Sequence, residues 1–109
     1  MTEIRLIYVV CPDEACARDI GRKMVEQRMA ACANILPKMS SIYRWEGKLE
    51  EARESLLLLK TVEANVKELH ERIRKLHPYR LPAIVDYPAT GGLPEYLDWV
   101  RQGSSARHH

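Results

Sequence analysis

The most regular apolar pattern in the chain lies between residues 62 and 76. Apolar side chains recur there with spacings of four, three, four and three residues, at Val62, Val66, Leu69, Ile73 and Leu76. This spacing places them in one stripe along an α-helix, whereas a strand would alternate them between two faces. Pro78 ends the pattern, because a proline inside a helix removes a backbone hydrogen bond. The sequence therefore predicts an amphipathic helix over residues 62–76 that buries its stripe against another layer.

Short apolar runs on both sides of this helix are typical of β-strands. They are rich in β-branched, aromatic or leucine residues and cover residues 4–10, 40–46, 55–61 and 82–87. Gly47 supplies a hairpin turn after the second run, because it tolerates positive φ. Residues 49–54 return from this turn with many charges before the four-leucine run begins. These patterns predict four strands, with the leucine-rich one at the centre of a sheet.

Two further helices are expected. The first covers residues 14–28, with Asp13 as its N-cap. The small apolar residues 29–36 carry its end into a strand, in which Pro37 marks a bulge or an edge position. A last short helix is expected over residues 93–100, with Pro94 in its first turn.

The order of these elements is β-α-β-β-α-β followed by a helix, which is the split β-α-β pattern of the ferredoxin-like α+β class. We therefore expect an antiparallel four-stranded sheet with two helices on one face. The other face also carries apolar residues, and a 109-residue chain has no second layer to cover it, so we expect oligomerisation to do so. Residues 1–102 are expected to form a single domain. Residues 103–109 are expected to be a disordered tail, and its terminal histidines carry no metal argument.

Charge and motif content exclude several classes of function. Seventeen basic and fifteen acidic residues leave a net charge of +2, which gives no general case for a nucleic-acid or membrane partner. No stretch approaches the ~20 apolar residues of a membrane span, and we see no signal-peptide pattern. An odd set of three cysteines favours free thiols in a reducing cytoplasm. No common hydrolase or phosphate-binding motif occurs, so we expect no enzyme.

Two residues are the candidate metal ligands. His77 lies in a corner stiffened by Pro78 and Pro82, and imidazole suits copper and zinc. The alternative is a hydrogen-bonded histidine that closes the helix. Cys11 follows the first strand and precedes a helix N-terminus, whose dipole favours a thiolate that could bind soft copper or react with oxidants. The alternative is a small apolar residue of the strand.

Other chemistry-bearing residues have simpler interpretations. Cys16 and Cys32 are expected in the core. Tyr43 and Trp45 share one strand face and are expected as anchors of a subunit interface, although they could also line a pocket between subunits. Four glutamates surround the hairpin and could bind a hard cation, but a solvated, charged hairpin is favoured. These are Glu46, Glu50, Glu51 and Glu54.

Six segments, in the right order, also resemble one known family. They are residues 11–14 (CPDE), 25–35 (VEQRMAACANI), 41–47 (SIYRWEG), 59–61 (LKT), 77–79 (HPY) and 96–100 (YLDWV). The chain resembles the CutA family of divalent-cation tolerance proteins. Two positions depart from the family pattern: Arg80 stands where an acidic residue often follows His-Pro-Tyr, and Leu76 stands where some members have a second histidine.

The resemblance implies a stable homotrimer of ferredoxin-like subunits, similar in assembly to PII signalling proteins. It also implies a role in the response to metal ions, with Cu(II) or another divalent cation bound and no tightly bound cofactor. The alternative is a PII-like trimeric sensor or assembly module that binds small molecules, such as anionic metabolites, in the clefts between subunits.

Overall fold

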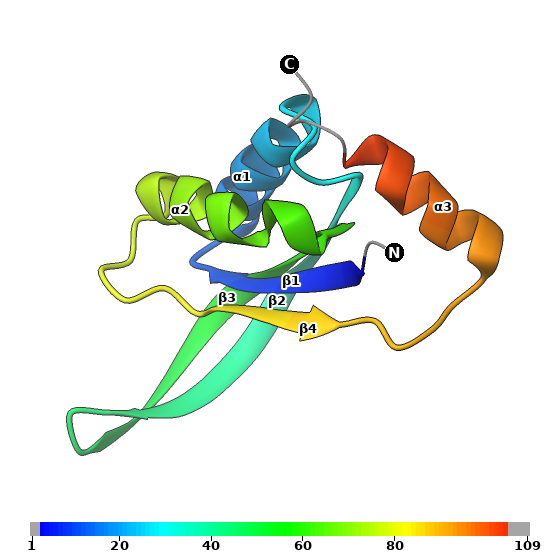
Figure 1. The fold of residues 1–109 in the computed structure, drawn as a ribbon. Coiled ribbons are helices and arrows are strands. Elements are labelled where there is room, and N and C mark those ends of the chain that lie inside the picture. Colours follow the sequence, from blue (N-terminus) through cyan, green and yellow to red (C-terminus); the bar gives the residue numbers. More distant parts are fainter. Residues whose placement is uncertain (1–2, 105–109) are drawn as a thin grey trace.

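A computed structural model describes residues 3–104. Its elements in chain order are β1 (Ile4–Cys11), α1 (Glu14–Glu26), β2 (Cys32–Trp45), β3 (Lys48–Val62), a 3-10 turn η1 (Glu63–Asn65), α2 (Val66–Leu76), β4 (Ile84–Pro88) and α3 (Pro94–Gly103). All neighbouring strands are antiparallel, in the order β2-β3-β1-β4. Helices α1 and α2 lie together over one face of the sheet (Figure 1). The α+β, ferredoxin-like fold predicted from the sequence is therefore confirmed.

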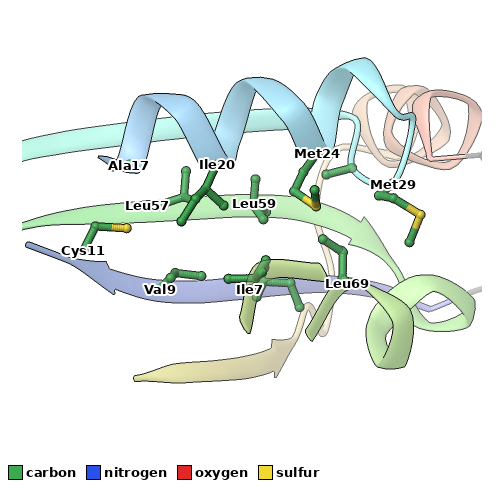
Figure 2. Packing of buried hydrophobic residues seen from close by; sticks show 12 residues of the cluster. Ile7, Val9, Cys11, Ala17, Ile20, Met24, Met29, Leu57, Leu59 and Leu69 are labelled. Atoms are coloured by element: carbon green, nitrogen blue, oxygen red, sulfur yellow. The ribbon is translucent and has the colours of Figure 1, made fainter. Parts of the chain in front are cut away.

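The core lies between this helical layer and the sheet. Alternate residues of β1 and β3 point into it, and Ile7, Val9, Leu57 and Leu59 among them are 0% exposed. Figure 2 shows Ile20 and Met24 of α1 pointing towards Leu57 and Leu59 of β3. Leu69 and Ile73 supply the centre of the α2 stripe. The residues between them on β1 and β3 face the opposite side, which these helices leave open.

Both long helices are shorter than the sequence predicts. Val62 pairs with Ile4 in the sheet, and η1 separates it from α2, which begins only at Val66. Pairing with β1 thus outweighs the helical spacing of Val62. At the other helix, α1 ends at Glu26, because Arg28 adopts a left-handed φ of 59° that the helix cannot accommodate.

Strands β2 and β3 form one long hairpin that projects well beyond the helices (Figure 1). The charged residues 49–54 belong to β3 and are not a separate returning segment. The turn has positive φ at Glu46 (51°) and Gly47 (81°), as expected for a tight hairpin. The ladder is irregular between Leu36 and Met39, which confirms the bulge predicted at Pro37.

The C-terminal helix packs against the end of the open face. Val100 of α3 forms a small buried cluster with Ile4 and Val62. Helix α3 continues to Gly103, and the buried Ser104 accepts a 2.9 Å hydrogen bond from Asn65. The expected disordered tail is therefore wrong at these two positions, and residues 105–109, with the terminal histidines, lie outside the described part. Among the described helices, none is long and apolar enough to cross a membrane.

Candidate functional site

The corner that follows α2 is held by hydrogen bonds to His77. Its Nε2 lies 2.7 Å from the carbonyl oxygen of Val10, and its Nδ1 accepts a 3.1 Å hydrogen bond from the backbone N–H of Tyr79. This pattern fits the neutral imidazole with its proton on Nε2. The side chain is buried, and both of its ring nitrogens have partners within the protein. A metal ion at His77 would have to break one of these hydrogen bonds.

Cys11 lies at the end of β1 and is 0% exposed. Burial, together with the adjacent Cys16 thiol, raises the pKa of Cys11 to about 12. The expectation that the helix dipole favours its thiolate is therefore wrong, because removal from water outweighs the partial charge at the helix end. Cys16 is partly buried against the core, as expected, and burial also raises its pKa. Cys32 is only partly buried, and its thiol contacts Asn34.

Metal-ligating side chains are not gathered within one subunit. Across residues 3–104, no group of three or more histidine, cysteine, aspartate or glutamate residues is placed to hold a metal ion. His77 and Cys11 thus lie on adjoining elements without forming a ligand cluster. Because stable zinc or copper sites usually need three or four ligands, the residues of a single subunit do not fit a bound divalent cation.

Sequence reasoning missed the role of Glu54. It was expected among the solvated glutamates of the hairpin, yet it is only 7% exposed. The Tyr79 hydroxyl donates a 2.7 Å hydrogen bond to its Oε2. Burial and this hydrogen bond raise the pKa of Tyr79. The sequence signal for this burial was the alternation of side chains between the two faces of a strand, which places Glu54 on the same face of β3 as Leu56 and Leu58.

Glu54 and Tyr79 belong to the wall of a hollow of about 490 Å³ on the open side of the sheet. The hollow extends from the corner along the projecting hairpin. Its wall is mainly aromatic and aliphatic, with three polar members. The lining residues are Tyr43, Trp45, Tyr79, Val10, Leu81, Ala83, Ser41, Glu54 and Arg80.

The open face around this hollow is apolar over much of its area. Leu36, Val85 and Tyr87 lie on it, and each is close to half exposed. They stand in register with inner-strand residues of the same face, Leu56, Tyr8 and Leu6 respectively. Contiguous exposed apolar surface of this kind is typical of an interaction site.

The sheet order, the paired helices and the extended hairpin define a ferredoxin-like α+β protein with one sheet face that only α3 covers, at its end. The chain belongs to the CutA1 divalent ion tolerance protein family, whose model matches residues 5–103.

Relatives and solved structures agree with this assignment. The divalent-cation tolerance protein CutA of Thermus thermophilus is 48% identical over 104 residues, which are 95% of this chain and 99% of the relative. The Xylella fastidiosa CutA structure superposes with a TM-score of 0.90 at 42% identity, covering 94% of this chain and 98% of the other. The Thermus thermophilus structure has a TM-score of 0.89 at 45% identity, covering 96% and 100%.

Relatives from animals are longer. The Xenopus laevis CutA homolog is 46% identical over 93 residues, which are 85% of this chain but 62% of the relative.

Proposed function

We propose that this protein is a homotrimer that binds a divalent cation, with copper the favoured metal, and acts in the response to metal ions in the cytoplasm. It needs no catalytic activity for this role. The names of its relatives support the metal tolerance. Three unpaired cysteines suit a reducing compartment.

The open sheet face carries the proposal of a trimer. Leu36, Val85 and Tyr87 would lose their contact with water in such an assembly. Burial of apolar surface contributes about 25 cal/mol per Å², so an uncovered face of this kind favours association. Closed homo-oligomers are the common way to cover it.

The metal proposal requires ligands from more than one subunit. His77 and Cys11 are the proposed contributors, although one subunit supplies no complete ligand cluster among its described residues. A subunit boundary on the open face would bring the corner of one subunit towards side chains of another. Coordination there would release the proton of the Cys11 thiol, so binding should strengthen as the pH rises.

Calorimetric titration with Cu(II) tests the metal proposal. The unmodified protein should show saturable binding, and His77→Ala and Cys11→Ala should each weaken it about tenfold or more. His70→Ala is the matched control, because this histidine lies on α2 beside Asp86 and away from the corner. Absence of saturable binding, or equal affinity in the His77 and His70 variants, would contradict the proposal.

A second candidate function is that of a PII-like small-molecule sensor. The specific observation in its favour is the hollow of about 490 Å³ with aromatic walls, a size within the usual range of ligand pockets. This function predicts ligand-induced thermal stabilisation that chelators do not affect.

A further inference from the structure

We propose that Cys11 and Cys16 form a redox-active pair, in which a hydroperoxide converts the two thiols into an intramolecular disulfide. This modification site is built within one subunit. Its consequence for metal binding rests on the proposed function, because Cys11 is a proposed metal ligand. The formation of the disulfide does not depend on that function.

The first argument is the placement of the two side chains. Cys11 is the last residue of β1, and Figure 2 shows it among the side chains of the buried core. Cys16 lies in the first turn of α1 and packs against the same buried cluster. Its backbone N–H donates a 2.8 Å hydrogen bond to Oδ1 of the N-cap Asp13, which fixes where the helix begins. The turn between β1 and α1 thus brings both cysteines to one place in the core.

The pair lies on the helical side of the sheet. Alternation along β1 places Cys11 on the same face as Val9 and Ile7, which α1 and α2 cover. The open face, which we propose that other subunits cover, is the opposite side of the sheet (Figure 1). The burial of Cys11 is therefore complete within one subunit and does not depend on the assembly.

The second argument is the direct contact between the two thiols. Burial raises the pKa of Cys11, and a hydrogen bond with the Cys16 side chain raises it further. At Cys16 burial also raises the pKa, but the same hydrogen bond acts in the opposite direction. These opposite effects identify the Cys11 thiol as the donor and the Cys16 sulfur as the acceptor. Two sulfur atoms in such contact need little movement to form a covalent bond.

The third argument is the difference in exposure, which assigns the two steps. Cys11 is 0% exposed, whereas Cys16 is only partly buried and is the thiol that a peroxide reaches. The Cys16 thiolate attacks a peroxide oxygen, the O–O bond breaks, and an alcohol (water, for hydrogen peroxide) leaves, which produces a sulfenic acid at Cys16. The Cys11 thiol then loses its proton, and its sulfur attacks the Cys16 sulfur and displaces water. In total, two thiols lose two electrons and two protons, and one hydroperoxide is reduced to the alcohol and water.

The same burial makes this reaction slow. Because the pKa of each thiol is raised, only a small fraction of either is thiolate near neutral pH. The disulfide should therefore form under sustained oxidation, and its rate of formation should increase with pH.

Cys32 provides an internal control. It stands opposite Lys60 of β3, whereas Cys11 stands opposite Ser55 of the same strand. Its thiol contacts the side chain of Asn34. Among the described residues, Cys32 therefore has no thiol beside it with which to form an intramolecular disulfide.

Mass spectrometry of the full-length protein tests the proposal. The protein is reduced, freed of reductant and treated with hydrogen peroxide in the presence of a chelator, and remaining thiols are then alkylated. We expect the mass of the protein to fall by that of two hydrogen atoms before alkylation. Proteolysis after Glu14 cuts the chain between Cys11 and Cys16, so the two resulting peptides should remain joined until a reductant is added.

Variants separate the roles of the cysteines. Cys32→Ser should form the disulfide at the rate of the unmodified protein, whereas Cys11→Ser and Cys16→Ser should not form it. In Cys11→Ser the sulfenic acid of Cys16 has no second thiol to attack it, so dimedone should capture it. In Cys16→Ser the yield of dimedone adduct at the buried Cys11 should be lower by about tenfold or more. Circular dichroism establishes that each variant keeps its fold.

Three outcomes overturn the proposal: an unchanged mass, addition of oxygen to separate cysteines without joined peptides, or an intramolecular disulfide that still forms in Cys16→Ser. If a cysteine variant does not fold, the peptide map of the unmodified protein still decides the question.

Calorimetric titration of the oxidised protein with Cu(II) separates this proposal from that of metal binding. The disulfide removes the Cys11 thiol as a ligand, so it should weaken Cu(II) binding by about tenfold or more. A disulfide that leaves the Cu(II) affinity unchanged would contradict Cys11 as a ligand and support the redox pair. Absence of the disulfide, with normal Cu(II) binding, would refute the redox pair and leave the metal proposal standing.

Discussion

Removal of the Tyr79 hydroxyl should destabilise the protein measurably. This hydroxyl donates a 2.7 Å hydrogen bond to the buried carboxylate of Glu54. Hydrogen bonds to charged groups contribute about 1.5–3 kcal/mol, and the residual exposure of Glu54 lets water replace part of the loss. We therefore expect Tyr79→Phe to lower the free energy of unfolding by about 2 kcal/mol. Guanidinium unfolding at a fixed protein concentration measures this change, since the stability of an oligomer depends on concentration.

A matched variant and a double-mutant cycle isolate the interaction. Tyr43 lines the same hollow without a hydrogen bond to Glu54 among the described contacts, so Tyr43→Phe should change stability by less than about 0.5 kcal/mol. In the cycle of Tyr79→Phe with Glu54→Gln, the coupling energy should be about 1–2 kcal/mol. Equal effects of the two tyrosine substitutions, or a coupling energy near zero, would refute the reasoning.

Three other perturbations have defined outcomes. Burial raises the pKa of Cys11 from 9.0 to about 12, so this thiol contributes its whole share to the free energy of unfolding below about pH 9 and loses it as the pH rises towards 12. Cys11→Ala should flatten this decline in pH-dependent unfolding curves. A Cβ at Gly103 would lie 2.7 Å from the Cβ of Ala31, so Gly103→Ala should lower the free energy of unfolding by about 1–3 kcal/mol, as measured by thermal unfolding. A Cβ at Gly91 has nothing within 4 Å, so Gly91→Ala should lower it by less than about 0.5 kcal/mol. A Val85→Asp substitution on the open face should yield a folded protein of lower mass by light scattering, and an unchanged mass would exclude this residue from the interface.

The architecture could be predicted because its signals are local. The periods of helix and strand, the turn at Gly47 and the bulge at Pro37 each depend on neighbouring residues, and together they define the order of elements. The main error over the fold concerned Val62. Its spacing fits a helix, but pairing with Ile4, more than fifty residues away, places it in β3. Such long-range pairing leaves no trace in a local period.

The candidate site was harder to predict for the same reason. Glu54 stands in a charged segment that is typical of a solvated surface, and its partner Tyr79 reaches it from the corner beyond α2. The raised pKa of the Cys11 thiol could not be predicted, because the helix end was visible in the sequence but the depth of burial was not. His77, in contrast, could be recognised as a rigid corner residue. The hydrogen bonds of its two ring nitrogens could not be predicted, because one of them depends on where the fold places Val10 of β1.

The mass of the protein in solution tests the central claim most directly, because both the metal proposal and the covered sheet face depend on association of subunits. Light scattering coupled to gel filtration at micromolar concentration should give three times the 12.6 kDa of one chain. A mass of 12.6 kDa would contradict the account, since the apolar face that carries Leu36, Val85 and Tyr87 would then remain exposed to water.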